Sequence, residues 1–278
     1  MEREELLVSK LKELGEVEII GKTYLGRNVP LVKIGKNAKV LLIASVHARE
    51  HITSTLLNAL VSEKSEIDGC NFDYLPYANL DGVLLAKYGL DTVKDENARK
   101  QLLNINKGSE DFSLWKANAR GVDINVNFDA DWGEGRYNLT YPSSANYIGK
   151  DANSEEETRA IVELLKRNYA LIVCYHSLGE EVYWGYESNF RHYEEAKEYA
   201  DYVGYKLRRI EDSTGGIKDY YSLNYSGLGL TVEIGEEKYG HPYPEDKLDL
   251  LINKHKGSIR LLCKLGERIS GRINATCY

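Results

Sequence analysis

Runs of apolar residues predict the strands of this chain. Residues 40–46 and 169–175 are almost wholly apolar, as expected for strands that are buried on both faces of a sheet. A third strand is expected at 229–235 and a short one at 72–75. Residues 17–35 are expected to form two strands around a glycine-containing turn. The predicted strands are therefore distributed along the whole chain.

The segments between these strands carry helical patterns. Ser154 is expected to cap a helix, because its hydroxyl can accept from early backbone N–H groups and Glu157 can reach back three residues later. The other expected helices are the charged N-terminal segment, 52–63, 189–207 and 245–268. Strands that alternate with helices predict an α/β fold, with a mixed, largely parallel, twisted sheet covered by helices on both faces. Without a linker of biased composition, residues 1–278 are expected to form a single domain.

The composition is that of a globular protein with a sizeable core. Of the 278 residues, 42% are hydrophobic and 28% are charged. The formal net charge of −7 argues against nucleic acid as a partner, because phosphates bind basic surfaces. The cysteines form no CxxC pair and are expected to be free thiols: Cys70, Cys174, Cys263 and Cys277.

The N-terminal sequence is charged and has none of the features of a cleavable signal. The chain also contains no apolar stretch of about 18 or more residues, so neither a membrane span nor a membrane partner is expected. Both observations favour a cytoplasmic location, where cysteines stay reduced.

His47 and Glu50 are the first residues with metal-binding chemistry. They form an HxxE pair directly after the strand at 40–46, and a spacing of three can bring both side chains to one ion. An isolated HxxE pair is common by chance, but His176 follows a second buried strand, and such strands end near one another. The three side chains are candidate zinc ligands, since a catalytic site has three protein ligands and one open position. The other histidines lack such positions: His51, His192, His241 and His255.

Glu233 is an acidic residue inside a third apolar strand. An ionised carboxylate in such a strand is costly unless it is paired or used. Strand alternation places its side chain on the same face as Thr231 and Gly235. An edge strand with Glu233 in solvent would also explain the pattern. Beside a metal, Glu233 becomes a candidate general base for an attacking water molecule.

The ordered set of motifs resembles the zinc carboxypeptidases of the carboxypeptidase A type. Residues 77–82 resemble the family's N-P-D-G turn, with Leu80 in place of Pro, and 118–128 resemble its G-V-D-L-N-R-N-F motif. Residues 154–158 resemble its S-E-P-E-T helix start, and Gly215-Gly216 resembles its paired glycines. The likeness extends from about residue 16 to the C-terminus, in the family's order.

The resemblance implies a carboxypeptidase-like fold with zinc as the cofactor. His47, Glu50 and His176 would hold the metal. Glu233 would activate a water molecule and pass its proton to the leaving amine.

Further roles are implied for residues that bind the substrate. Lys116 stands at the spacing where the family keeps an Arg that polarises the scissile carbonyl, and Arg120 is the competing candidate. Asn125 matches the Asn that binds the substrate's carboxylate. Arg49 and Ser177 match substrate-contacting residues beside two of the ligands.

Two departures from the family pattern point to an unusual substrate. Val126 stands where a carboxypeptidase has the Arg that clamps the C-terminal carboxylate, and the family's capping Tyr is missing before Gly215. Residues 115–125 and 216–220 resemble instead the bacterial branch, whose members cleave γ-D-glutamyl-diaminopimelate bonds in cell-wall peptides. Lys218 lies at the side-chain pocket position, where a cation would favour an acidic group such as the extra carboxylate of diaminopimelate.

The sequence thus predicts a zinc-dependent metallopeptidase that hydrolyses an amide bond in a small peptide, with γ-D-glutamyl-diaminopimelate as the expected target. Three alternatives stay open: a general metallocarboxypeptidase, a deacylase of N-acyl amino acids on the same scaffold, and a non-catalytic relative that binds wall peptides. The complete set of ligands and base argues against the last of these.

Overall fold

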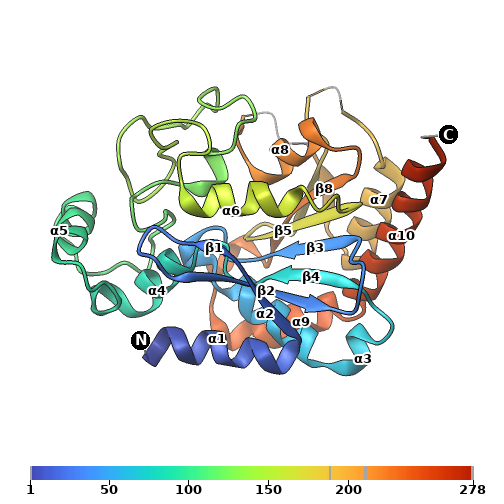
Figure 1. The fold of residues 1–278 in the computed structure, drawn as a ribbon, viewed down its shortest axis with the longest axis horizontal. Helices are drawn as coiled ribbons and strands as arrows, with labels where there is room; N and C mark the ends of the chain where they lie inside the picture. Colours follow the sequence, from blue (N-terminus) through green and yellow to red (C-terminus); the bar gives the residue numbers. More distant parts are fainter. Residues whose placement is uncertain (1, 188, 210–211, 277–278) are drawn as a thin grey trace.

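A mixed sheet forms the centre of the protein (Figure 1). The computed structural model describes residues 2–187, 189–209 and 212–276. The sheet has eight strands in the order β1-β2-β4-β3-β5-β8-β6-β7. Their bounds are β1 (Glu16–Lys22), β2 (Asn28–Ile34), β3 (Val40–Ile43), β4 (Phe72–Leu75), β5 (Leu171–Ser177), β6 (Glu181–Trp184), β7 (Lys206–Arg208) and β8 (Leu228–Ile234). The central strands β4, β3, β5 and β8 are parallel, whereas β1 and β2 run antiparallel at one side and β6 runs antiparallel to β8.

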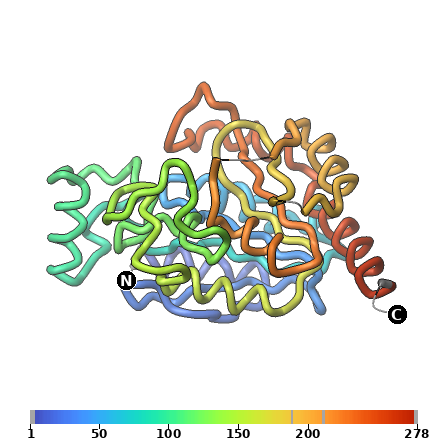
Figure 2. The backbone as a smooth tube through the Cα atoms, turned by 90° about the horizontal axis from the view of Figure 1, so that it is seen from above, coloured from blue at the N-terminus to red at the C-terminus, as the bar shows by residue number. Residues whose placement is uncertain are grey.

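Helices cover both faces of this sheet, as predicted. Their bounds are α1 (Glu2–Leu14), α2 (Ile52–Ser62), α3 (Lys64–Ile67), α4 (Leu80–Tyr88), α5 (Glu96–Ile105), α6 (Glu156–Leu165), α7 (Tyr193–Val203), α8 (Ile217–Asn224), α9 (Leu248–His255) and α10 (Ser258–Thr276). In Figure 1, α6 and α8 lie above the sheet, and α1, α2 and α9 lie below it. Figure 2 shows α5 and α10 at opposite ends of the molecule.

Successive side chains of the buried strands point to opposite faces of the sheet, so they contribute to two hydrophobic cores. Val40 and Leu42 of β3 pack in the cluster that contains residues of α1, α2, α7, α9 and α10. Leu41 and Ile43 pack in the other cluster, with α6 and α8. All residues of β5 are buried, which explains its continuous apolar run.

The same alternation directs the candidate site residues. His176 and Glu233 are register partners on the adjacent parallel strands β5 and β8. Tyr175 and Val232, one residue earlier on each strand, face the first core. His176 and Glu233 therefore point to the face that carries α6 and α8, at the carboxyl ends of the strands.

Three sequence-based boundaries are wrong in detail. β3 ends at Ile43 rather than at residue 46, because Ser45 has a left-handed φ of 50°. The expected helix over 245–268 is two helices, α9 and α10, separated at Gly257 with φ 76°. The expected helix over 189–207 is shorter, since α7 begins at Tyr193 and ends at Val203.

The predicted cap of α6 is wrong by one residue. Glu155 is the N-cap of α6 and makes no side-chain capping bond. The hydroxyl of Ser154 donates instead to Glu155 Oε1 at 2.8 Å.

The structure also bears on the predictions about the cysteines and about membrane-spanning segments. Cys70, Cys174 and Cys263 are free and buried, as predicted, and Cys277 lies outside the described residues. No helix in the described ranges combines the length and the apolar character that a membrane crossing needs.

Candidate metal centre and substrate pocket

His47, Glu50 and His176 meet at the carboxyl ends of β3 and β5. His47 Nδ1 lies 2.8 Å from Glu50 Oε1, and His176 Nδ1 lies 3.1 Å from Glu50 Oε2. The two Nδ1 atoms are 3.1 Å apart. All three side chains are buried, with residue exposures of 6%, 3% and 1% in chain order. The structure thus brings together the three side chains that the sequence nominated as ligands.

A short 3-10 turn, η1 (Ala48–Glu50), gives the HxxE pair its geometry. The turn is fixed to a distant loop, because Ala48 N donates to the carbonyl of Lys116 at 3.1 Å. The carboxylate of Glu50 also accepts from Ser177 N at 3.3 Å. The His47 and Glu50 side chains therefore converge through a turn, as the spacing of three required.

The chemistry of this cluster fits a divalent cation. Deprotonated imidazole nitrogens and a carboxylate are all acceptors, so they can stay 3.1 Å apart only around a proton or a cation. Burial opposes ionisation of Glu50, but the adjacent His47 and His176 hold the pKa of its carboxyl well below the ordinary value. Two nitrogens and one carboxylate form the donor set that catalytic zinc prefers. Within the described residues, this buried His-Glu-His cluster is the strongest candidate metal centre.

Asp123 connects the candidate ligands to Lys116. Its Oδ1 lies 3.4 Å from His47 Nε2, and its Oδ2 lies 2.7 Å from Lys116 Nζ. Burial alone would raise the pKa of Asp123, but the Lys116 ammonium and His47 lower it strongly. An ionised carboxylate behind a ligating imidazole fixes the orientation of the ring.

Glu233 faces a polar cavity of about 190 Å³ next to His47. Burial raises the pKa of the Glu233 carboxyl to about 8, although His176 acts in the opposite direction. A cation held by the three candidate ligands would lower this pKa, because positive charge favours the ionised form. The position of Glu233 beside the ligands excludes the alternative in which it lies in solvent on an edge strand.

The cavity also contains three of the predicted substrate-binding and catalytic residues. Lys116, Asn125 and Lys218 line it, and Tyr183 and Asp219 complete much of the wall. Asn125 belongs to the 3-10 turn η3 (Ile124–Val126), and its Oδ1 accepts from Ile217 N at 3.3 Å.

Arg49 and Ser177 lie beside the candidate ligands. Both carry a buried polar atom without a hydrogen-bond partner among the described residues, Nε of Arg49 and Oγ of Ser177. Arg120 lies elsewhere. Its guanidinium pairs with Glu155 at 3.1 Å and Glu156 at 3.0 Å, and the described cavity lining does not include it.

Several neighbours of the site could not be selected from the sequence. Asp123 and Asp219 carried no signal beyond their place in family-like motifs, and Tyr183 was indistinguishable from packing tyrosines. His241 was set aside as an ordinary histidine, yet charged groups at the candidate metal centre contribute to its pKa. Burial lowers the pKa of His241, Glu50 opposes this change, and Arg49 adds to it.

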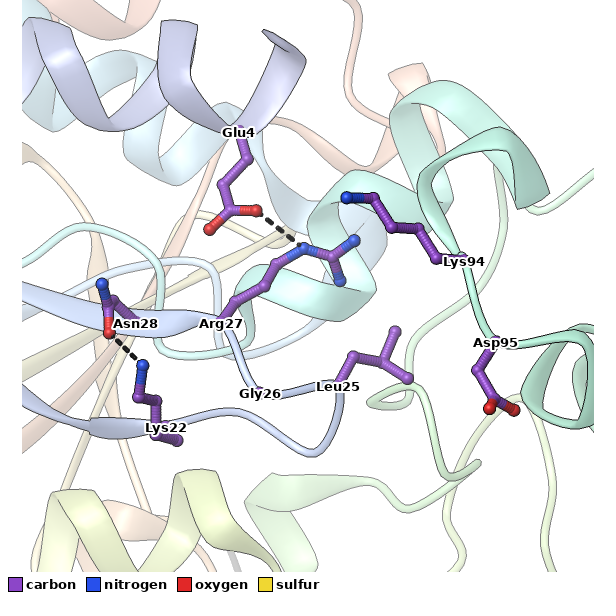
Figure 3. A pocket seen from close by; sticks show the side chains of 8 residues that line it. All are labelled: Glu4, Lys22, Leu25, Gly26, Arg27, Asn28, Lys94 and Asp95. Carbon is purple, nitrogen blue, oxygen red and sulfur yellow. Dashed lines mark hydrogen bonds and ion pairs between the residues drawn. The ribbon is translucent and has the colours of Figure 1, made fainter. Parts of the chain in front are cut away.

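A second depression, of about 340 Å³, lies at the turn between β1 and β2 (Figure 3). Its central cation is already neutralised, because Arg27 pairs with Glu4 at 3.1 Å and with Asp81 at 2.5 Å. Arg27 also donates to the carbonyl of Thr92. These contacts tie α1 and α4 to the turn, which is a structural role.

Glu157 is buried beside Asp81 on the same side of the protein. Its carboxyl oxygens accept from Tyr24 N at 3.1 Å and from Asn118 Nδ2 at 3.3 Å. Burial, with the nearby Asp81 and then Glu155, raises the pKa of Glu157 to about 8. Glu157 therefore holds a proton in the folded protein at neutral pH.

This proton predicts a loss of stability as the pH rises. The unfolded chain releases it near the ordinary pKa of 4.5 and the folded protein releases it near 8. The free energy of unfolding should fall by about 1.4 kcal/mol per pH unit between these values. Urea denaturation from pH 5 to 8 should show a smaller fall in Glu157→Gln, whereas the exposed Glu163→Gln should behave like the wild type. Equal slopes in both variants would contradict the assignment.

A comparison with known proteins decides the family. The model of the zinc carboxypeptidase family matches residues 4–256 of the chain. The chain belongs to the zinc carboxypeptidase family. The predicted family and zinc as the cofactor are thereby confirmed.

Individual relatives and solved structures agree with this family. The γ-D-glutamyl-L-diamino acid endopeptidase 1 of Lysinibacillus sphaericus is 29% identical over 260 residues, covering 86% of this chain and 64% of that protein. The chain thus spans just under two thirds of this relative. Bovine thrombin-activatable fibrinolysis inhibitor has a TM-score of 0.74 at 19% identity, covering 98% of this chain and 95% of the other. The murein-tripeptide amidase MpaA of Escherichia coli O157 has a TM-score of 0.58 at 21% identity, covering 90% and 94%. These structures confirm the carboxypeptidase-like fold.

Proposed function

We propose that this zinc carboxypeptidase family member hydrolyses the γ-D-glutamyl-diaminopimelate bond of cell-wall peptides. The observation that carries the proposal is the shared cavity. Glu233, Lys116 and His47 line the same space, so a base, a cation and a candidate metal ligand all face one scissile amide. Zinc held by His47, Glu50 and His176 would supply Lewis-acid polarisation of a carbonyl and of a water molecule.

The residues of the chain divide the remaining work. Glu233 takes the proton of the attacking water and delivers it to the leaving nitrogen. Lys116 Nζ donates to the carbonyl oxygen as negative charge develops on it. Its partner Asp123, at 2.7 Å, keeps the ammonium in place between turnovers.

The remaining candidate residues are proposed to hold the substrate. Asn125 lines the cavity together with Lys116 and Glu233. Arg49 and Ser177 offer unpaired buried polar atoms beside Glu50 and His176. Arg120 is less suited to a substrate contact, because Glu155 and Glu156 already bind its guanidinium.

Three observations support the substrate class: the absence of the carboxylate-clamping Arg at position 126, the cation of Lys218, and the name of a relative. Val126, 8% exposed, is an apolar residue at the position of the carboxylate-clamping Arg, so a free C-terminal carboxylate is not bound there. Lys218 supplies a cation deeper in the cavity. The relative from Lysinibacillus sphaericus bears the name of a γ-D-glutamyl-L-diamino acid endopeptidase.

A pair of substrates tests the proposal. Zinc-loaded protein should hydrolyse L-Ala-γ-D-Glu-meso-diaminopimelate with a higher kcat/KM than an N-blocked Gly-Phe dipeptide, which suits an ordinary carboxypeptidase. Preference for the dipeptide would refute the cell-wall substrate and leave the peptidase assignment in place.

Loss of the Lys116 cation is expected to slow the chemical step. Lys116→Met should lower kcat by about 10²-fold, the usual effect of removing one oxyanion donor. Lys116→Arg keeps the charge and should recover part of the rate. Because Lys116→Met leaves Asp123 without its cation, thermal denaturation must show that the variant is folded in the assay. An unchanged kcat in folded Lys116→Met would exclude Lys116 from catalysis.

Two organisational predictions belong to this proposal. Residues 1–278 are proposed to act as a single domain, which limited proteolysis would test. A cytoplasmic location is the second of these predictions, and fractionation of cells would test it.

A further inference from the structure

The floor of the cavity beside Glu233 is a buried ion pair. Lys218 Nζ lies 2.5 Å from Asp219 Oδ1, and the two side chains are 4% and 5% exposed. Lys218 Nζ also donates to the carbonyl of Gly185 at 2.7 Å. Both members of the pair line the cavity, so the floor presents a cation and an anion side by side.

The hydrogen-bonding capacity of this floor is not exhausted. An ammonium has three donors; the carbonyl of Gly185 accepts one of those of Lys218, and Asp219 Oδ1 is the ion-pair partner of the ammonium. The other oxygen of Asp219 accepts from Gly216 N at 3.1 Å, and each carboxylate oxygen has two lone pairs. One donor of Lys218 and acceptor sites of Asp219 remain for a bound molecule.

Tyr183 adds an acceptor to the wall. Its hydroxyl donates to Glu181 Oε2 at 2.5 Å, which leaves the phenolic oxygen able to accept. Tyr183 pairs with Thr231 across β6 and β8, and both line the cavity. The lining of the cavity therefore offers both oxygen acceptors and an ammonium donor.

The charges of Lys218 and Asp219 limit which substrate group fits in the cavity. A substrate group with only a carboxylate would bind Lys218 but would also lie against Asp219. A group with only an ammonium would bind Asp219 but would lie against Lys218. A head group with both charges pairs with each member and leaves the buried site neutral, so it is the best electrostatic match.

We propose that this cavity binds a zwitterionic head group, with Lys218 holding its carboxylate and Asp219 and Tyr183 holding its ammonium. The inference rests on the proposed function, since the head group is placed on the diamino acid that leaves with the amine. It assigns Asp219 and Tyr183 as specificity-determining residues, and it makes the distal end of the diamino acid the feature that the enzyme selects.

Four peptides of the form L-Ala-γ-D-Glu-X test the proposal on the zinc-loaded protein. X is meso-diaminopimelate (both charges), L-lysine (ammonium only), L-2-aminopimelate (carboxylate only) or L-norleucine (neither). The kcat/KM for meso-diaminopimelate should exceed that for each singly charged peptide by about tenfold or more, the usual effect of one charged hydrogen bond.

Variants should change these preferences in opposite directions. Lys218→Met should make the meso-diaminopimelate and lysine peptides nearly equal, because the carboxylate gains nothing. Asp219→Asn should bring the rates for the meso-diaminopimelate and 2-aminopimelate peptides much closer together, because the ammonium loses its ion-pair partner and keeps only the oxygen of Tyr183. Tyr183→Phe should slow only the two peptides with an ammonium. Lys197→Met, at a half-exposed lysine of α7 paired with Asp201, is the matched control and should leave all ratios unchanged.

The outcomes separate the two proposals. Equal rates for meso-diaminopimelate and either singly charged peptide in the wild type would overturn the zwitterion site and leave the proposed function standing. Hydrolysis of the N-blocked Gly-Phe dipeptide with none of the four peptides cleaved would overturn the proposed function itself. Asp219 also accepts from Gly216 N, so Asp219→Asn could misfold. In that case the wild type is inhibited with the four free amino acids instead, and meso-diaminopimelate should bind most tightly.

Discussion

Replacement of Glu233 by Gln is expected to lower kcat by about 10²- to 10⁴-fold, the range for removal of a general base. Gln keeps the size of the side chain but cannot take a proton from water. His47, Glu50 and His176 are untouched by the change, so zinc content should remain near one equivalent. KM should change little, because the lost interaction belongs to the transition state. Steady-state kinetics and metal analysis of the same preparation measure all three quantities.

Glu237→Gln is the matched control for this experiment. Glu237 is an exposed residue of the 3-10 turn η4 (Glu237–Tyr239), four positions after Glu233. The control should have wild-type kinetics. A Glu233→Gln protein that binds zinc and retains wild-type kcat would remove Glu233 from the mechanism.

The sequence was sufficient to select the cluster of candidate metal ligands, because both histidines come at or after the end of a buried strand. The apolar runs of β3 and β5 could be recognised without a structure. His176 lies near the end of β5, and His47 lies four residues after the end of β3. Parallel neighbours in one sheet bring their carboxyl ends to the same edge, so topology alone brings such residues together. The Glu233 prediction followed from a different argument, the cost of a carboxylate in an apolar strand.

The substrate pocket was harder to predict because its residues come from elements that approach only in the folded chain. Tyr183 reaches the cavity from β6, which pairs antiparallel with β8, and nothing in its local sequence distinguishes it from packing tyrosines. Lys218 was predicted to line the side-chain pocket as a cation. Its partner Asp219 is the next residue, yet the 2.5 Å ion pair depends on rotamers that a sequence does not contain.

Competition between Lys116 and Arg120 shows the same limit. Both are cations at a suitable spacing after Trp115, and the sequence left the choice open. In the folded protein, the carboxylates of Glu155 and Glu156 bind Arg120, whereas Asp123 holds Lys116 at the cavity. Long-range ion pairs therefore separate two residues that a local pattern treats as equivalent.

Removal of zinc with a chelator is expected to abolish hydrolysis and to lower the Tm by several degrees. A ligand present at a hundredfold its Kd, and bound only by the folded state, stabilises a protein by about 2.7 kcal/mol. Burial of the ligands adds to this effect. Glu50 is 3% exposed and its carboxylate contacts two imidazoles, so without the cation these acceptor groups are buried against one another. Differential scanning calorimetry before and after chelation, and after zinc is returned, measures the effect.

His176→Ala is the genetic counterpart of chelation. It removes one nitrogen from a set of three candidate ligands. Glu50 Oε2 then loses the imidazole of His176 and keeps only the hydrogen bond from Ser177 N at 3.3 Å. The variant should bind zinc far more weakly, lose hydrolysis, and show no rise in Tm when zinc is added. His192→Asn is the matched control, since His192 has a left-handed φ of 61° that Asn accepts and its Nε2 donates to the carbonyl of Ser226 at 2.9 Å rather than to a candidate ligand. One equivalent of tightly bound zinc together with full activity in His176→Ala would show that the metal is held elsewhere.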